Sequence, residues 1–131
     1  MLFLEDVRDF VSTLGTTEDD KVYMGKMGNK KDRSIGVYQL KQSRAPTVSL
    51  GDTGTYKVKP ISLLVHWSKS ARETEQAAYR LYELLSKVQN VTINDKKIIY
   101  IQMLQEEPVD VDMDESKVYE RVIEVLIYYE R

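Results

Sequence analysis

The one side chain suited to acid–base chemistry at neutral pH is the single histidine, His66. A hydrolase would place such a ring between a nucleophilic serine and an orienting carboxylate. His66 instead stands next to Trp67 in the apolar run LLVHW, and no motif places a nucleophile beside it. We therefore expect His66 to be a hydrogen-bonded structural residue of a central strand, with hydrolysis through His66 as the minor alternative.

Three aspartates at alternate positions, Asp110, Asp112 and Asp114, resemble the start of a calcium-binding loop. An EF-hand loop needs glycine at its sixth position and a bidentate glutamate at its twelfth. Counted from Asp110, these positions hold Glu115 and Arg121. The motif fails at both positions, so the sequence predicts a solvated acidic loop and no metal site.

One segment gathers basic side chains: Lys26, Lys30, Lys31 and Arg33. Such a cluster could contact nucleic-acid phosphates, but no interleaved aromatic residues or helix–turn–helix pattern accompany it. Complementary charges also give protein interfaces their register and specificity. The basic segment and the three aspartates of a neighbouring subunit are therefore our candidate interface, and a solvated surface is the alternative.

The amino-acid composition and the spacing of the glycines exclude several other kinds of functional site. The chain has no cysteine, which excludes disulfides, thiol catalysis and cysteine metal sites. Its glycines form neither GxGxxG nor GxxxxGK[ST]. We expect no catalytic residue, no cofactor and no enzymatic activity.

Charge and hydropathy limit which partners the protein is expected to bind and where in the cell it is expected to be. A formal net charge of −2 gives no global attraction to nucleic acid or to an anionic membrane. Glu5 and Asp6 directly follow the apolar start MLFL, which does not fit a secretion signal. No apolar run approaches the roughly 20 residues that span a bilayer. We expect a soluble protein made in the cell interior.

Hydrophobic periodicity predicts the elements that position these residues. The chain of 131 residues has the length of one domain, residues 1–131. Apolar stripes predict helices over residues 3–14 and 70–88, the second begun by a capping box of Ser70 and Glu73. Strands are expected over residues 22–26, 34–41, 61–67, 91–93, 97–105 and 118–129.

The connections between these strands carry further expectations. The strands at 22–26 and 34–41 are expected to form a hairpin with a basic tip at Gly28-Asn29, and Asn94-Asp95 to form a tight turn. Residues 42–59 read as a long loop, and residues 106–116 as an acidic one. The predicted fold class is α+β: a mixed, mostly antiparallel sheet with two helices packed on one face, in the order α-β-β-β-α-β-β.

Three stretches carry a family likeness: VYMGKMGNKKDRSIGVYQLK, ISLLVHWSKSARETEQAAYRLYELL and the C-terminal IYIQMLQEEPVDVDMDESKVYERVIEVLIYYER. Together they resemble the minor capsid proteins of tailed bacteriophages and prophages of Gram-positive bacteria. The most specific parts are Gly25-Lys26, Asn29-Lys30, Ile35-Gly36-Val37-Tyr38, Leu64-Val65-His66-Trp67 and Glu107-Pro108-Val109-Asp110. Chain length and element order are similar to those of tail-terminator and tail-completion proteins, which join head to tail.

This resemblance implies a structural virion protein of the head–tail connection. It implies a ring, expected to be hexameric, that terminates the tail tube and joins it to the head connector. The partners would be further copies of the chain, the tail tube protein and the head-completion proteins. DNA would pass through the lumen without sequence-specific binding, and no membrane would be involved. The alternative is a small host-directed protein-binding module without catalysis.

Overall fold

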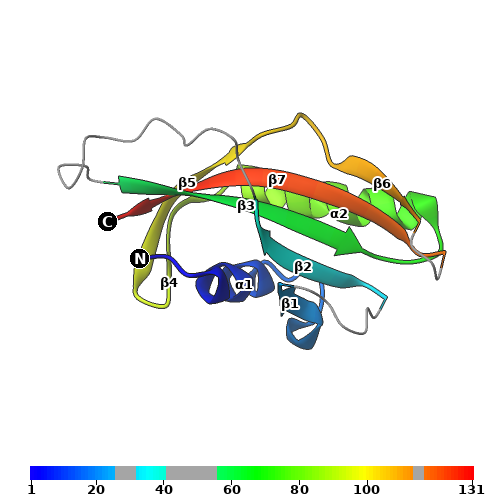
Figure 1. Cartoon of the computed structure of the whole chain (residues 1–131), viewed down its shortest axis with the longest axis horizontal. Helices are drawn as coiled ribbons and strands as arrows, with labels where there is room; N and C mark the ends of the chain where they lie inside the picture. The colour runs from blue at the N-terminus through cyan, green and yellow to red at the C-terminus, as the bar shows by residue number, and fades with distance from the viewer. Residues whose placement is uncertain (26–31, 41–55, 114–116) are drawn as a thin grey trace.

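The computed structural model describes residues 1–25, 32–40, 56–113 and 117–131, apart from the side chains of residues 112 and 113 (Figure 1). The described part contains two α-helices, a 3-10 turn and seven strands. In chain order they are α1 (Leu4–Thr13), η1 (Asp19–Lys21), β1 (Val22–Met24), β2 (Ser34–Gln39), β3 (Tyr56–His66), α2 (Ala71–Ser86), β4 (Gln89–Ile93), β5 (Lys96–Met103), β6 (Val109–Met113) and β7 (Tyr119–Glu130).

The strands form one sheet in the order β1-β2-β3-β7-β5-β4. Strand β7 pairs with β3 along one edge, and with β6 and then β5 along the other edge. Each pair is antiparallel except β1 with β2. The last strand in chain order is therefore at the centre of the sheet (Figure 1).

Both helices cover one face of this sheet, and the core lies between. Cross-strand partners on that face include Val37 with Leu63, and Leu63 with Ile123. Phe10 of α1 and Leu81 of α2 pack against them, and all five side chains are at most 2% exposed. The predicted α+β fold, with a mostly antiparallel sheet and two helices on one face, is confirmed.

Local hydrogen bonds fix where the helices begin. In α1 the Asp6 carboxylate accepts the backbone N–H of Phe3 at 2.8 Å. In α2 the Ser70 hydroxyl oxygen accepts the N–H of Glu73 at 3.3 Å, as predicted. The predicted return bond from Glu73 to Ser70 is wrong, because Ser68 replaces it: the Ser68 hydroxyl donates to Glu73 at 3.1 Å and accepts the N–H of Ser70 at 3.2 Å.

The predicted hairpin of residues 22–41 is wrong, since β1 runs parallel to β2 with Val22 opposite Ile35. An alternating apolar pattern reads the same in both directions, so it gives no strand direction. Contact with α1 holds β1 in place: Arg8 Nε donates to the Val22 carbonyl at 2.9 Å. The predicted Gly28-Asn29 turn lies outside the described residues.

Two predicted loops contain strands. Strand β3 begins at Tyr56, within the loop expected over 42–59, and continues through Pro60, which pairs with Leu126 of β7. The strand expected over 61–67 therefore starts five residues earlier, and it carries a proline in its interior, where proline is rare because it cannot donate to the ladder. In the acidic loop, β6 pairs Val109 with Val122. Four strands therefore follow α2, one more than the three strand ranges expected there and two more than the predicted element order.

Candidate subunit interface

Only part of the predicted interface falls within the described residues. Lys26, Lys30, Lys31 and Asp114 lie outside them, and Asp112 is placed by its backbone in β6. Arg33 and Asp110 are both described and both exposed. These two residues locate the candidate surfaces in the fold.

Arg33 and Asp110 lie at the same end of the sheet, on opposite flanks. The N–H of Arg33 donates to the carbonyl of Trp67 at 2.7 Å, just before β2 begins. Asp110 of β6 is opposite Arg121 of β7. Since β3 and β7 separate β2 from β6, the strand spacing puts the two residues about 14 Å apart. A contact between them would have to join two copies of the chain.

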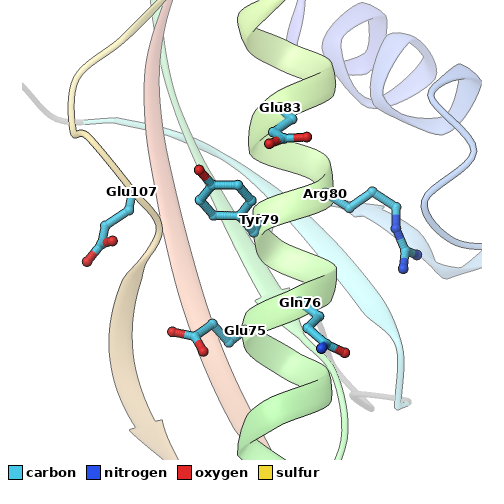
Figure 2. A pocket seen from close by; sticks show the side chains of 6 residues that line it. All are labelled: Glu75, Gln76, Tyr79, Arg80, Glu83 and Glu107. Carbon is cyan, nitrogen blue, oxygen red and sulfur yellow. The ribbon is translucent and has the colours of Figure 1, made fainter.

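On the β6 flank, a surface groove of about 520 Å³ runs between α2 and the β5–β6 connection (Figure 2). We call it the Tyr79 groove. It is lined by Glu75, Gln76, Tyr79, Arg80, Glu83 and Glu107. Glu75 and Tyr79 point from α2 toward the connection that carries Glu107, whereas Arg80 points to the opposite side of the helix (Figure 2). The Tyr79 side chain is among the large exposed ones, at 47%.

The groove follows from the helical period of α2. Glu75, Tyr79 and Glu83 are four residues apart and form one outer stripe, opposite the buried stripe that contains Ala78 and Leu81. This spacing could have been read from the sequence. Glu107 belongs to a different element, so its place across from Tyr79 depends on the tertiary fold.

Tyrosine contacts hold the connection on the helix. The rings of Tyr79 and Tyr82 stack with centroids 6.1 Å apart. The Tyr82 hydroxyl donates to the carbonyl of Gln105 at 2.5 Å, which fastens the β5–β6 connection to α2. Burial, and then the neighbouring Tyr79 and Glu106, raise the pKa of Tyr82 above its ordinary value. Its hydroxyl therefore remains a protonated donor at neutral pH.

The groove presents more negative than positive charge. Glu75 pairs with Arg121 at 3.5 Å, and Arg121 also donates to the carbonyl of Pro108 at 3.2 Å. Among the described residues, no ion pair involves Glu83 or Glu107. Carboxylates around an exposed tyrosine suit a cationic side chain, which gains from the charges and from the ring face.

The β2 flank of α2 has the opposite character. A hollow of about 250 Å³ is lined there by Arg33, Trp67, Glu73, Gln76, Ala77 and Arg80. We call this surface the Arg33 flank. Within the described part of the chain, neither of its two arginines forms an ion pair. The groove and the hollow adjoin at Gln76 and Arg80 of α2, and the groove is mainly acidic whereas the hollow is mainly basic.

His66 is a buried, hydrogen-bonded residue, as predicted. Its Nδ1 lies 2.9 Å from Oε2 of Glu120, its cross-strand partner on β7. Ser34 on β2 is opposite His66 on the other side, so serine, histidine and glutamate stand in one row. These are the residue types of a serine hydrolase. The three residues are only 0%, 1% and 7% exposed, however, so a substrate could not reach them.

The described residues offer no other chemical centre. They contain no cluster of three or more histidine, cysteine or acidic side chains that could hold a metal ion. No helix in the described ranges is long and apolar enough to cross a membrane. What the described residues do present is an α+β scaffold with charged and aromatic surfaces, a class of protein suited to contacts with other macromolecules.

Comparison with known families identifies the protein family within this class. The sequence model of the bacteriophage tail terminator protein family matches residues 10–131. The chain belongs to this family, which confirms the likeness to tail-terminator proteins seen in its sequence. Members are structural tail proteins, so the chain is a tail-related component of the virion. A search of curated proteins gave no match.

Proposed function

We propose that the protein forms a ring, expected to be hexameric, that terminates the tail tube and joins it to the head connector. The observation that carries this proposal is the family match over residues 10–131. In this proposal residues 1–131 act as a single structural domain without catalysis. The ring lies at the head–tail interface of a phage or prophage particle of a Gram-positive host, after synthesis in the host cytoplasm.

A ring of identical subunits needs two different complementary surfaces on each subunit. Opposite charge on the two flanks of α2 supports such an arrangement. The sequence-derived interface belongs to the same proposal: Lys26, Lys30, Lys31 and Arg33 of one subunit would face Asp110, Asp112 and Asp114 of the next. The tail tube protein and head-completion proteins would bind above and below, and DNA would pass through the lumen without base-specific contacts.

Particles assembled without the protein test this function. We expect heads and tails that do not join, and tails of abnormal length, when examined by electron microscopy. Adding back the purified protein should restore joined particles, and a reconstruction of these should place a ring at the junction. Tails of normal length joined to heads in its absence would contradict the proposal.

A pull-down from infected cells tests the alternative predicted from the sequence, a host-directed binding module. Recovery of tail and connector proteins is expected. Recovery of a bacterial protein, with no virion component, would favour the alternative.

A further inference from the structure

We infer that the Tyr79 groove of one subunit receives the Arg33 flank of a second copy of the chain. This rests on the proposed ring, and it names the surfaces that make the lateral contact. The inferred contact differs from the pairing predicted from sequence, since its carboxylates come largely from α2 rather than from the acidic stretch after Val109.

The side chains of the Tyr79 groove indicate which kind of group it binds. Glu83 and Glu107 lie around a tyrosine whose side chain is 47% exposed, on a surface large enough to accept a side chain from outside. An arginine guanidinium can stack on a tyrosine face while it donates to carboxylates. Arg33 supplies such a group on the same chain, at the edge of the adjoining hollow.

The positions of the two surfaces indicate the symmetry of the contact between subunits. The Tyr79 groove lies on the β6 flank of α2 and the Arg33 flank lies on its β2 side, both toward the same end of the sheet. A two-fold contact between grooves would oppose carboxylates and is unfavourable. A head-to-tail contact joins groove to arginine and leaves one of each surface open, so that further copies can add until the ring closes.

Arginine and tyrosine dominate many protein interfaces, so single changes here should have large effects. We expect Glu83→Arg and Arg33→Glu each to weaken self-association roughly tenfold to a hundredfold, as measured by sedimentation velocity over a range of concentrations. Combining both changes in one chain should recover much of the loss, because the two charges are exchanged. Glu130→Arg makes the same charge change on an exposed residue at the other end of β7 and should leave association unaltered.

Cysteine cross-linking tests the geometry directly, because the natural chain has no cysteine. A chain that carries both Arg33→Cys and Glu83→Cys, treated with a short bis-maleimide, should give a ladder of covalent oligomers that ends at the closed ring. Either single variant alone should stay monomeric on a denaturing gel. The control pair, Arg33→Cys with Glu130→Cys, should give no ladder.

The outcomes separate this inference from the proposed function. Rings that assemble with unchanged affinity in Glu83→Arg and Arg33→Glu, or a ladder only in the control pair, would overturn the inferred contact while the ring itself stands. A wild-type protein that neither self-associates nor is required for joined particles would contradict both. Circular dichroism of each variant shows whether the fold is retained.

Discussion

His66 Nδ1 lies 2.9 Å from Glu120 Oε2, and the two side chains are neighbours on the antiparallel strands β3 and β7. Ser34 continues the same row on β2. Moving one of these strands by a single residue would turn each of its side chains to the opposite face. The buried polar row thus favours one register for β2, β3 and β7. This register fixes the backbone at the end of the sheet where both candidate interface surfaces lie.

Removing one member of this pair should destabilise the fold. His66→Leu leaves the buried Glu120 carboxyl without its ring partner, which we expect to lower the free energy of unfolding by about 2–4 kcal/mol. The double variant His66→Leu/Glu120→Leu should recover much of the loss, since apolar pairs often replace buried polar pairs at little cost. Urea denaturation measures both values, and a loss below about 1 kcal/mol in the single variant would show that the row contributes little.

Asp6 should make the fold sensitive to acid. Its carboxylate joins α1 to the β4–β5 hairpin through Asn94 Nδ2 at 3.0 Å and through Lys96. Burial by itself would raise the pKa of Asp6, but the hydrogen bonds from Lys96, Asn94 and the Phe3 N–H outweigh it and hold the pKa below 3.8.

A carboxyl group with a lowered folded-state pKa stabilises the fold above its unfolded-state pKa and loses that contribution as the pH falls through the folded value. Stability of the wild type should therefore fall more steeply below pH 3.8 than that of Asp6→Asn, which lacks the titrating group. Chemical denaturation at a series of pH values provides the comparison. Parallel curves for the two proteins would exclude this role for Asp6.

The positive charge of Lys59 should lower the stability of the fold. Burial lowers the pKa of Lys59 and the charge of Asp6 partly opposes this. A lysine whose folded pKa is depressed disfavours folding while it is protonated, and the penalty is relieved as the pH rises toward 10.5. Lys59→Met should therefore raise stability at neutral pH, with no gain at strongly alkaline pH. Thermal unfolding at both pH values measures the difference.

The start of α2 should depend on its serines more than on Glu73. Ser70→Ala removes the oxygen that accepts the Glu73 N–H and should cost about 1 kcal/mol. Ser68→Ala should cost a similar amount, because Ser68 accepts the Ser70 N–H. Glu73→Ala removes only the acceptor of the Ser68 hydroxyl, so it should cost less than Ser68→Ala in urea denaturation. A larger loss in Glu73→Ala than in Ser68→Ala would favour the reciprocal cap expected from the sequence.

The sequence indicated most of the scaffold because its apolar periods are strong. The stripe that contains Ala78 and Leu81 defined α2, and the Asn94-Asp95 turn has the positive φ angles, 49° and 63°, that a tight hairpin needs. Strand β6 was missed because its acidic composition hid the alternation of Val109, Asp110 and Val111. The direction of β1 was missed because it depends on packing against α1.

Less of the candidate interface could be predicted. Asp110 and Arg33 were found from local charge alone, and the structure puts them on opposite flanks. Tyr79 and Glu83 were visible as a four-residue spacing on an exposed helical stripe, but that spacing is equally typical of an ordinary solvated surface. Only the fold brings Glu107 across from them and turns the stripe into a groove.

The central place of β7 in the sheet also constrains when the chain can fold during its synthesis. Strand β3 depends on β7 along its whole length, from Tyr56 opposite Glu130 to His66 opposite Glu120, and β5 and β6 pair with β7 as well. During synthesis, β2 and β3 emerge from the ribosome long before β7 exists, so one edge of β3 stays unpaired during that time. Folding is therefore expected to finish only after the segment up to Glu130 has emerged, which makes the nascent chain a natural client of chaperones that cover exposed strand edges.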